Sequence, residues 1–323
     1  MSAVATAGSL QTEHLEQYRR ELVGYCYRML GSIHEAEDAV QDTMLRAWRA
    51  TATFEDQAGP RPWLYRIATN VCIDMVKGRS RRFMPIDVTT VGNSGSLFGD
   101  RRPAATWVQP APDSAILPLP TDPADRAVSR ESVRLAFIAA LQHLAPRQRA
   151  VLILRDVLRW QAAEVAVLLG TSADAVNSTL RRARATVGKI DHKTAPSQPS
   201  TDDQALLAAY IAAFEHHDVD ALVTLLHDDA ILEMAPFDLW LRGKDDIRQW
   251  LIAVDALADH KLTPLRANGC AAAAVYGLPQ PGGPPTAHAI HVLDIVAGNI
   301  SAIHAFIDPS LFELFGAPIV HQA

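Results

Sequence analysis

Residues 161–187 read QAAEVAVLLGTSADAVNSTLRRARATV and form the most informative segment of the chain. Apolar residues recur at helical spacing over its first nine positions. Gly170 then predicts a tight turn, and Ser172 is a suitable N-cap for a second helix over 173–187. This second helix carries a polar and basic set of side chains: Asn177, Ser178, Thr179, Arg181, Arg182 and Arg184.

A helix, a glycine-containing turn and a basic helix are typical of a helix-turn-helix, whose second helix lies in the major groove of DNA. Arginine bridges guanine edges or phosphates, and asparagine pairs with adenine, so this composition suits base reading and phosphate neutralisation together. A helical hairpin with a solvated basic face would have the same pattern. The segment alone leaves both interpretations open.

A second basic cluster follows the segment 63–74, WLYRIATNVCID, and consists of Lys77, Arg79, Arg81 and Arg82. A protein that binds single-stranded or melted DNA needs aromatic rings on which bases stack, and cations that follow the phosphates. The alternative is that Trp63 and its apolar neighbours belong to a protein core, and spacing alone favours this alternative.

The charge of the chain is divided unevenly along its 323 residues, a length that suggests two or three domains. Apolar residues make up 49% and charged residues 20%, as in an ordinary globular protein. Residues 1–200 hold 25 Lys and Arg against 20 Asp and Glu, whereas residues 201–323 hold 5 against 16. The first part can therefore approach a polyanion such as DNA, and the second part repels one.

Several classes of protein are disfavoured. Apolar runs such as 271–276 are much shorter than the ~18 residues of a membrane span, and the N-terminus has no signal-peptide pattern. Cys26, Cys72 and Cys270 are widely spaced and have no histidine at ligand spacing, which argues against a disulfide framework and a zinc site. We therefore expect a cytoplasmic protein with no membrane segment, no metal and no cofactor.

Clusters of Pro, Gly and Ser divide the chain into modules. Seven prolines between residues 85 and 123 exclude a continuous helix or sheet there and predict a long linker. The expected modules are a flexible tail (1–14), a first helical domain (15–84), the Pro/Gly-rich linker (85–125), a second helical domain with the helix-turn-helix (126–192), a short linker (193–201) and a C-terminal domain (202–323).

The C-terminal domain begins with two amphipathic helices, around 206–214 and 219–226. Short β-branched segments follow, with Gly298-Asn299 as a hairpin turn between the last two. The predicted strands are 230–234, 287–296 and 300–307. This order predicts an α+β domain.

Four motifs resemble those of extracytoplasmic-function sigma factors of the sigma-70 family: AEDAVQD at 36–42, WLYRIA at 63–68 with Asn70 and Asp74, LAPRQRAVLILR at 144–155, and NSTLRRAR at 177–184. Their order and spacing match sigma region two followed by region four, over about residues 15–189. The sequence LWLRGKDDI at 239–247 is similar to part of a SnoaL-like domain. The resemblance implies a multidomain fold, with two all-α sigma domains (a region-two bundle and a region-four helix-turn-helix) and a C-terminal α+β SnoaL-like barrel of conical shape.

The resemblance also implies a role in transcription initiation, through binding of core RNA polymerase at its clamp coiled coil and flap, and through recognition and melting of promoter DNA. The residues that match the clamp-binding segment are Glu37, Asp38, Gln41 and Asp42. Those that match the −10 site are Trp63, Arg66, Asn70, Lys77, Arg79, Arg81 and Arg82, with Asn70 at the pocket for a flipped base. Those that match the −35 site are Ser172, Asn177, Ser178, Arg181, Arg182 and Arg184.

The linker departs from one SnoaL-fused sigma subgroup, which has a Trp-Leu-Pro-type motif there and a Gly-rich acidic motif in its C-terminal domain. This chain has WVQPAPD at 107–113 and no such Gly-rich motif near its C-terminus. It is more similar to a sister subgroup with a Trp-Leu-Gln-Pro-type linker. The resemblance to the fused subgroups implies that the C-terminal domain regulates the sigma domains in cis.

The barrel supplies candidate pocket residues and makes a small-molecule ligand a further candidate partner. The candidates are Glu233, Trp240, His288, His291, His304 and Asp308, with Asp294 nearby. Histidines and carboxylates on facing strands can transfer protons. Strand alternation, however, puts His288 and His291 on opposite faces, so the three histidines cannot all point inward without a bulge. We therefore assign no catalytic residue and expect no enzyme activity.

Two other functions are consistent with parts of the sequence. One is a SnoaL-type enzyme with a cyclase or hydratase-like activity, fused to a DNA-binding regulator. It would need a deep polar pocket with converging acid and base groups. The other is a one-component repressor, which would use the helix-turn-helix but would leave the motifs at 36–42 and 63–74 without a role.

Overall fold

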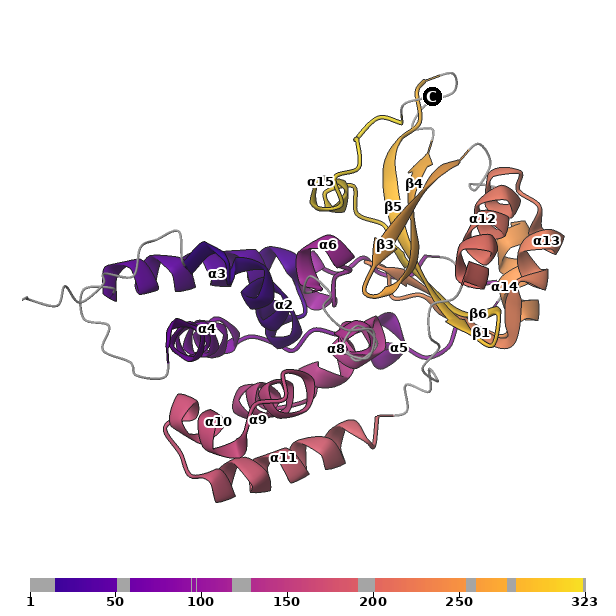
Figure 1. Cartoon of the computed structure of the whole chain (residues 1–323). Helices are drawn as coiled ribbons and strands as arrows, with labels where there is room; N and C mark the ends of the chain where they lie inside the picture. Colours follow the sequence, from indigo (N-terminus) through magenta and orange to yellow (C-terminus); the bar gives the residue numbers. More distant parts are fainter. Residues whose placement is uncertain are drawn as a thin grey trace, which may run out of the picture. The chain divides into compact units, whose positions relative to one another are not determined.

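The computed structural model describes residues 15–50, 59–93, 95–96, 98–117, 129–190, 201–253, 260–277 and 283–321 (Figure 1). The expected tail (1–14), residues 118–125 of the long linker and residues 193–200 of the short linker lie outside these ranges. The described residues fall into two units. The first unit is drawn from Met1–Arg79, Ala115–Pro118 and Leu141–Ile190, and the second from Ser80–Ser114, Leu119–Ala140 and Asp191–Ala323.

Three helices form the N-terminal part of the first unit: α2 (Arg19–Leu30), α3 (Ile33–Ala50) and α4 (Pro60–Val76). Helix α2 ends at Gly31, whose φ of 70° is left-handed and whose amide donates to the carbonyl of Tyr27. Proline at the first position of α4 fits a helix start, where its missing N–H costs nothing. Buried tyrosines join the helices, and the hydroxyls of Tyr25 and Thr69 are 2.7 Å apart.

The other part of the first unit contains the predicted helix-turn-helix. It consists of α9 (Pro146–Leu152), the π-helical turn η3 (Ile153–Val157), α10 (Ala162–Leu169) and α11 (Ala173–Val187). Within this unit it packs on the N-terminal helices. The ring centroids of Tyr65 and Trp160 are 5.0 Å apart. The buried guanidinium of Arg149 donates to Gln142 at 2.6 Å and to the carbonyl of Met29.

A six-stranded mixed sheet is the centre of the second unit (Figure 1). Its strands are β1 (Leu226–Ala235), β2 (Trp240–Arg242), β3 (Lys261–Ala267), β4 (Cys270–Gly277), β5 (Thr286–Val296) and β6 (Asn299–Phe306). The spatial order is β2-β1-β6-β5-β4-β3. The β1–β6 pair is parallel and the other pairs are antiparallel. Since β2 and β3 stand at the two ends of this order, the sheet that the described residues form is open and is not a closed barrel.

Helices cover one face of this sheet and build its apolar core. They are α12 (Thr201–Glu215), α13 (Val219–Thr224) and α14 (Lys244–Ala253), which Figure 1 shows together on one side of the strands. Tyr210, Ile247 and Trp250 on the helices pack against strand residues such as Leu232 and Leu293. A short helix, α15 (Leu311–Leu314), follows β6.

The fold class expected from the sequence is confirmed: all-α domains followed by an α+β domain. The described residues of the linker form only short elements, namely α5 (Pro85–Val88), η2 (Ala104–Thr106) and α6 (Asp113–Ile116). Helix α8 (Leu135–Gln142) follows the linker. Three of the six strands, β2, β3 and β4, were not predicted. No helix in the described ranges is both long and apolar enough to span a membrane.

Candidate functional sites

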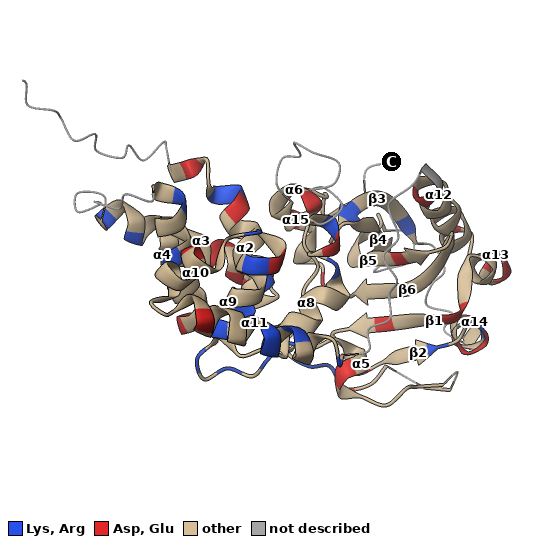
Figure 2. Cartoon of the chain, turned by 60° about the horizontal axis from the view of Figure 1, so that its bottom comes forward, with Lys and Arg blue, Asp and Glu red and all other residues tan. Residues whose placement is uncertain are grey.

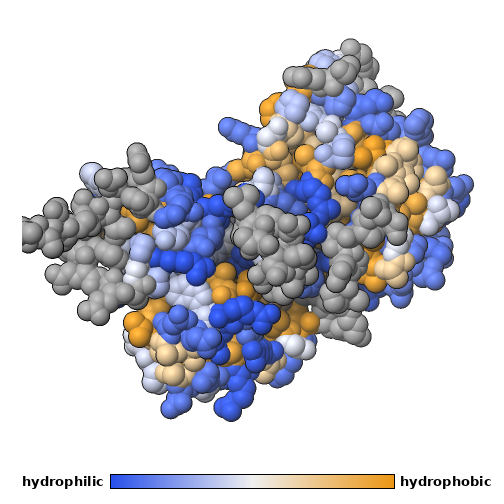
Figure 3. Space-filling model, viewed as in Figure 1, coloured by the Kyte–Doolittle hydropathy of each residue, from blue (hydrophilic) through white to orange (hydrophobic). Residues whose placement is uncertain are grey.

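The helix-turn-helix presents one face of α11 to solvent. Gly170 has a φ of 61°, which gives the tight turn, and Ser172 caps α11 by accepting the amide of Ala175 at 3.2 Å. Val176, Leu180 and Ala183 are buried and fix the helix on the unit. The side chains between them therefore point outward, and the surface where α11 lies is mainly hydrophilic in Figure 3.

The residues predicted for the −35 site differ in how they are held. Asn177, Arg181 and Arg182 are exposed, and Ser178 is half-buried. Arg184 forms a bidentate ion pair with Asp156, with distances of 2.6 and 2.9 Å. Figure 2 shows the Lys and Arg positions of the α11 ribbon in blue. The outward set of amide and guanidinium groups has the chemistry for base and phosphate contacts.

The residues predicted for the −10 site are separated by the structure. Arg66 and Asn70 are exposed on α4, whereas Trp63 on the same helix is buried. Lys77 pairs with Asp74 at 2.6 Å, and Arg79 pairs with Glu35. Both cations stay at the surface.

Two members of that predicted set, Arg81 and Arg82, belong to the second unit. Arg81 is exposed, and its guanidinium lies 4.7 Å from the ring centre of Phe83. Arg82 is only 8% exposed, and it donates to the carbonyls of Trp107 and Ala104 at 2.8 and 3.2 Å. The guanidinium of Arg82 therefore joins two parts of the linker, and it lies below the surface.

The predicted polymerase-binding residues lie along α3. Glu37, Asp38 and Gln41 are exposed, while Asp42 is half-buried and pairs with Arg46 at 2.8 Å. Sequence reasoning missed two neighbours on this helix: Leu45 is 46% exposed and Trp48 is 59% exposed. Trp48 lies two helical turns after the buried Val40, so its spacing alone indicates the buried side of the helix. Large exposed apolar side chains beside acidic ones are typical of a protein-binding surface.

The linker is docked on the C-terminal sheet, at its β2 edge and the adjoining β1–β2 turn. The amide of Gly92 donates to the carbonyl of Trp240 at 2.9 Å, and the indole of Trp240 donates to the carbonyl of Thr89 at 3.0 Å. Arg102 forms a bidentate ion pair with Asp238, with a shortest distance of 2.6 Å. Trp240, a predicted pocket residue, therefore holds the linker.

Asn268, in the turn between β3 and β4, holds the other end of the linker. It is fully buried with a left-handed φ of 54°. Its amide and its side-chain oxygen form a reciprocal pair with the backbone of Ala111, at 3.0 and 2.9 Å, and its side-chain nitrogen donates to the carbonyl of Val133 at 2.7 Å. One side chain thus joins the linker to the segment that precedes α8. Its position in a turn gave no sequence signal for this role.

A buried chain of charges crosses three neighbouring strands on the sheet face away from α12, α13 and α14. His304 on β6 lies between Glu233 on β1, at 2.6 Å, and Asp294 on β5, at 3.3 Å. Asp294 also accepts a hydrogen bond from Arg134 at 2.8 Å, and Glu233 accepts the amide of Ile86 at 3.0 Å. We call these four side chains, Glu233, His304, Asp294 and Arg134, the buried charge chain. It connects Ile86, at the start of the linker, to Arg134, in the segment that precedes α8.

The electrostatics of the buried charge chain favour its ionised form. Burial alone would lower the pKa of His304, but the hydrogen bonds and charges of Asp294 and Glu233 outweigh it and raise that pKa to about 10. Burial would raise the pKa of Asp294, yet its bonds to His304 and Arg134 hold that pKa well below its usual range. His304 is therefore a cation at neutral pH and donates from both ring nitrogens.

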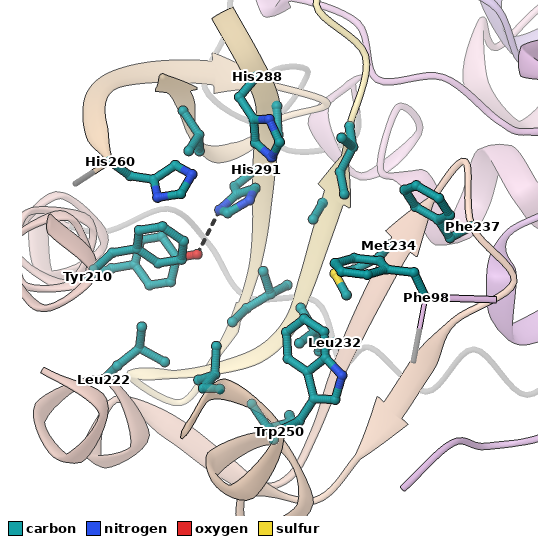
Figure 4. Close-up of a pocket in the computed structure, with 18 residues that line it drawn as sticks. Phe98, Tyr210, Leu222, Leu232, Met234, Phe237, Trp250, His260, His288 and His291 are labelled. Atoms are coloured by element: carbon teal, nitrogen blue, oxygen red, sulfur yellow. Dashed lines mark hydrogen bonds between the residues drawn. The ribbon is translucent and has the colours of Figure 1, made fainter. Parts of the chain in front are cut away.

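The opposite face of the sheet encloses a cavity of about 290 Å³ (Figure 4). Its described lining residues are aromatic and aliphatic apart from Tyr210 and three histidines, and they include no Asp, Glu, Lys or Arg. Figure 4 shows His260, His288 and His291 together at one end. The hydroxyl of Tyr210 lies 2.8 Å from Nδ1 of His291.

Of the six predicted pocket residues, the structure brings only His288 and His291 into this cavity. A register shift in the β4–β5 pair, at Val275 and Tyr276, is the bulge that lets both histidines face it. Glu233 and His304 belong to the buried charge chain on the other face, and Trp240 holds the linker. Asp308 lies beside the linker in a separate hollow of about 340 Å³, together with Arg101 and Arg102.

Models of three families match the chain: sigma-70 region 2 over residues 14–82, sigma-70 region 4 over residues 134–187, and the SnoaL-like domain over residues 207–303. The sequence is 46% identical over 315 residues to the ECF RNA polymerase sigma factor SigG of Mycobacterium tuberculosis. The aligned residues cover 94% of this chain and 83% of that protein. The chain belongs to the extracytoplasmic-function (ECF) RNA polymerase sigma factors.

Two further relatives span almost the whole chain. The probable ECF RNA polymerase sigma factor SigI of Mycobacterium tuberculosis is 27% identical over 307 residues, which is 92% of each protein. The crystal structure of the extracytoplasmic-function sigma factor SigJ from the same organism matches with a TM-score of 0.62 at 25% identity, over 96% of this chain and 100% of that one. Both matches include the C-terminal domain.

Proposed function

We propose that this chain directs core RNA polymerase to promoters in the cytoplasm, as a sigma factor without enzymatic activity. The exposed face of α11 is the observation that carries this proposal: a capped helix of a helix-turn-helix holds Asn177, Arg181 and Arg182 outward. In this proposal α11 reads the −35 element, and α4 with Arg66 and Asn70 reads the −10 element. The acidic and apolar face of α3 binds polymerase.

The packing within the first unit implies that the sigma domains separate when they bind a promoter. The −35 and −10 elements lie ~25 base pairs apart, as their numbering states. This separation is ~85 Å at ~3.4 Å per base pair. Trp160, next to α10, packs on Tyr65 of α4. Because α11 is only ~20 Å long at ~1.5 Å per residue, domains in that contact cannot reach both elements.

The docked linker supports regulation in cis. The segment between Ile86 and Arg134 has about 50 residues and would span ~160 Å if extended. In the structure the buried charge chain attaches both of its ends to three adjacent strands, which are ~10 Å across at ~4.8 Å per strand. The C-terminal domain thus shortens the reach of the linker, and opening on polymerase requires the linker to leave the sheet.

The alternative of a SnoaL-type enzyme fused to a DNA-binding regulator is less well supported. Such an enzyme needs converging acid and base groups in its pocket. Here the carboxylates Glu233 and Asp294 are paired on the opposite face of the sheet, and the described lining of the cavity has none. The cavity has the chemistry of a binding site.

Run-off transcription with core polymerase over a library of promoters tests the proposed function. We expect the double variant Arg181→Ala/Arg182→Ala to lose ~1–3 kcal/mol of promoter binding for each base-edge contact removed, and less for contacts to phosphate. Arg248→Ala, an exposed arginine of the C-terminal domain, is the matched control. Wild-type transcription by the double variant at a cognate promoter would contradict the assignment of α11.

A second experiment tests regulation in cis. Asn268→Ala removes the side chain that joins the linker to the segment before α8, and we expect it to raise promoter-specific transcription at limiting polymerase. Asp228→Ala, in an exposed ion pair with Lys244, is the control. Unchanged transcription with a folded Asn268 variant would contradict the regulatory role of linker docking. A fall would show that docking supports the active arrangement instead.

A further inference from the structure

The cavity of the C-terminal domain has a wall that does not belong to that domain. Phe98 lies in the linker between sigma regions two and four, and its side chain lines the cavity. Its ring centre is 5.0 Å from that of Phe237 and 5.8 Å from that of Trp250. The indole nitrogen of Trp250 donates to the linker carbonyl of Ser96 at 3.0 Å. The linker therefore completes the cavity, with Phe98 and Trp250 at the junction (Figure 4).

The chemistry of the lining restricts what can bind. The described lining includes the aromatic rings of Phe98, Phe214, Phe237 and Trp250, but no charged group that would pair with an ionised ligand. An ion in such a site would lose its hydration without compensation. A volume of about 290 Å³ is at the small end of ligand cavities, which range over ~300–1,000 Å³. The occupant that fits is small, neutral and rich in rings.

The His and Tyr end of the cavity adds one polar requirement. Tyr210 and His291 bond to each other through Nδ1, which leaves the second ring nitrogen of His291 to act as donor or acceptor according to the tautomer. Burial, with the neighbouring His288 and His260, lowers the pKa of His291 to about 3, so the ring is neutral near pH 7. A ligand hydroxyl can donate to this nitrogen when it carries no proton, and can accept from it when it does.

We propose that this cavity binds a small, neutral, ring-containing molecule with one hydroxyl group, and that bound ligand stabilises the docked linker by packing against Phe98. A ligand that needs Phe98 for its contacts binds the docked form better than the undocked form, and by linkage it shifts the equilibrium toward docking. The part of this inference that concerns transcription rests on the proposed function. The binding site and its coupling to the linker are independent of the proposed function.

The first experiment measures binding to the full chain at pH 7 by quenching of tryptophan fluorescence, confirmed by calorimetry. The probe is 2-naphthol, which has two fused rings and one neutral hydroxyl. Its matched controls are naphthalene, which lacks the hydroxyl, and 2-naphthoate, which is charged. We expect 2-naphthol to bind at least about tenfold more tightly than 2-naphthoate, because the carboxylate would be buried without a partner. Absence of 2-naphthol binding, or equal binding of 2-naphthoate, would overturn the proposed site.

The second experiment measures the coupling to the linker by hydrogen exchange at the amides of Gly92 and Arg102. These amides donate to Trp240 and Pro236, so their protection reports linker docking. Saturating 2-naphthol should slow their exchange severalfold in the wild type. Phe98→Ala should weaken binding and abolish this slowing, whereas Val91→Ala, an exposed linker residue outside the cavity lining, should change neither.

The outcomes separate the parts of the inference. If 2-naphthol binds but the exchange at Gly92 and Arg102 is unchanged, the coupling is wrong and only the binding site stands. If Phe98→Ala retains both full affinity and the slowing, the role of Phe98 is wrong. Neither experiment uses polymerase or promoter DNA, so a failure here is distinguishable from a failure of the proposed sigma function.

Discussion

Strand β1 carries opposite chemistry on its two sides within three residues. Leu232 and Met234 line the apolar cavity, whereas Glu233 between them belongs to the buried charge chain. The charged side attaches the start of the linker through the amide of Ile86, and the segment before α8 through the guanidinium of Arg134. The apolar side meets the linker through Phe98. One sheet therefore holds the same segment by two unlike interactions, one directional and charged, the other non-directional and apolar.

Removal of Asp294 should have the largest effect and would show that the charged side is the stronger attachment. Asp294→Ala leaves Arg134 and His304 buried without their shared carboxylate, and breaking a buried ion pair in this way costs ~3–5 kcal/mol. We expect a loss of this size in the free energy of unfolding, measured by urea denaturation. Asp228→Ala, which breaks an exposed pair, should have no measurable effect. Equal stability of the two variants would mean that the buried charges contribute little.

The contributions of the two sides to the free energy of unfolding should change with pH in opposite directions. The pKa of His304 is raised to about 10, so its contribution to stability is complete below about pH 6.5 and is lost as the pH rises toward 10. The pKa of His291 is lowered to about 3, so its contribution is complete above about pH 6.5 and is lost as the pH falls toward 3. Urea denaturation from pH 4 to 10 measures both slopes.

Single variants assign the two slopes to their histidines. His304→Gln should flatten the alkaline side of the stability profile and leave the acid side, while His291→Asn should do the reverse. If both variants keep the alkaline slope, the protonated state assigned to His304 is incorrect.

The smallest effect is expected on the apolar side. Tyr210→Phe removes one buried hydrogen bond, to His291, and should cost ~0.5–1.5 kcal/mol of the free energy of unfolding. Its effect on the cavity should be seen in 2-naphthol binding, which the remaining rings retain in large part. Denaturation and fluorescence quenching measure the two quantities on one sample. A cost as large as that of Asp294→Ala would remove the distinction between the two sides.

The features that the sequence predicted well are local. The turn at Gly170 and the cap at Ser172 follow from backbone preferences within a few residues, and both are present. Strand β4 was missed because Ala271 to Ala274 favour a helix intrinsically, and only burial between β3 and β5 makes them a strand. Local preference is overridden there by the sheet.

The parts of the sites that could not be predicted depend on partners far away in the chain. Arg82 was expected to contact phosphate because it ends a basic run, but its acceptors are the carbonyls of Ala104 and Trp107. Arg134 and Asp294 are 160 residues apart, and no period or spacing links them. His288 faces the cavity because of the bulge in the β4–β5 pair, and strict alternation of side chains along a strand does not account for a bulge.

The position of β6 has a consequence for how the protein is made. It is the last strand in chain order, yet it lies in the middle of the sheet, between β1 and β5. A ribosome adds ~5–20 residues per second, so the ~100 residues between α11 and β6 take ~5–20 s to synthesise. During that time the sigma helices are complete, but His304 has not yet joined Glu233 to Asp294. The contacts of the linker with Asp238, Trp240 and Asn268 involve residues made earlier, so the buried charge chain is the last of its attachments to be completed.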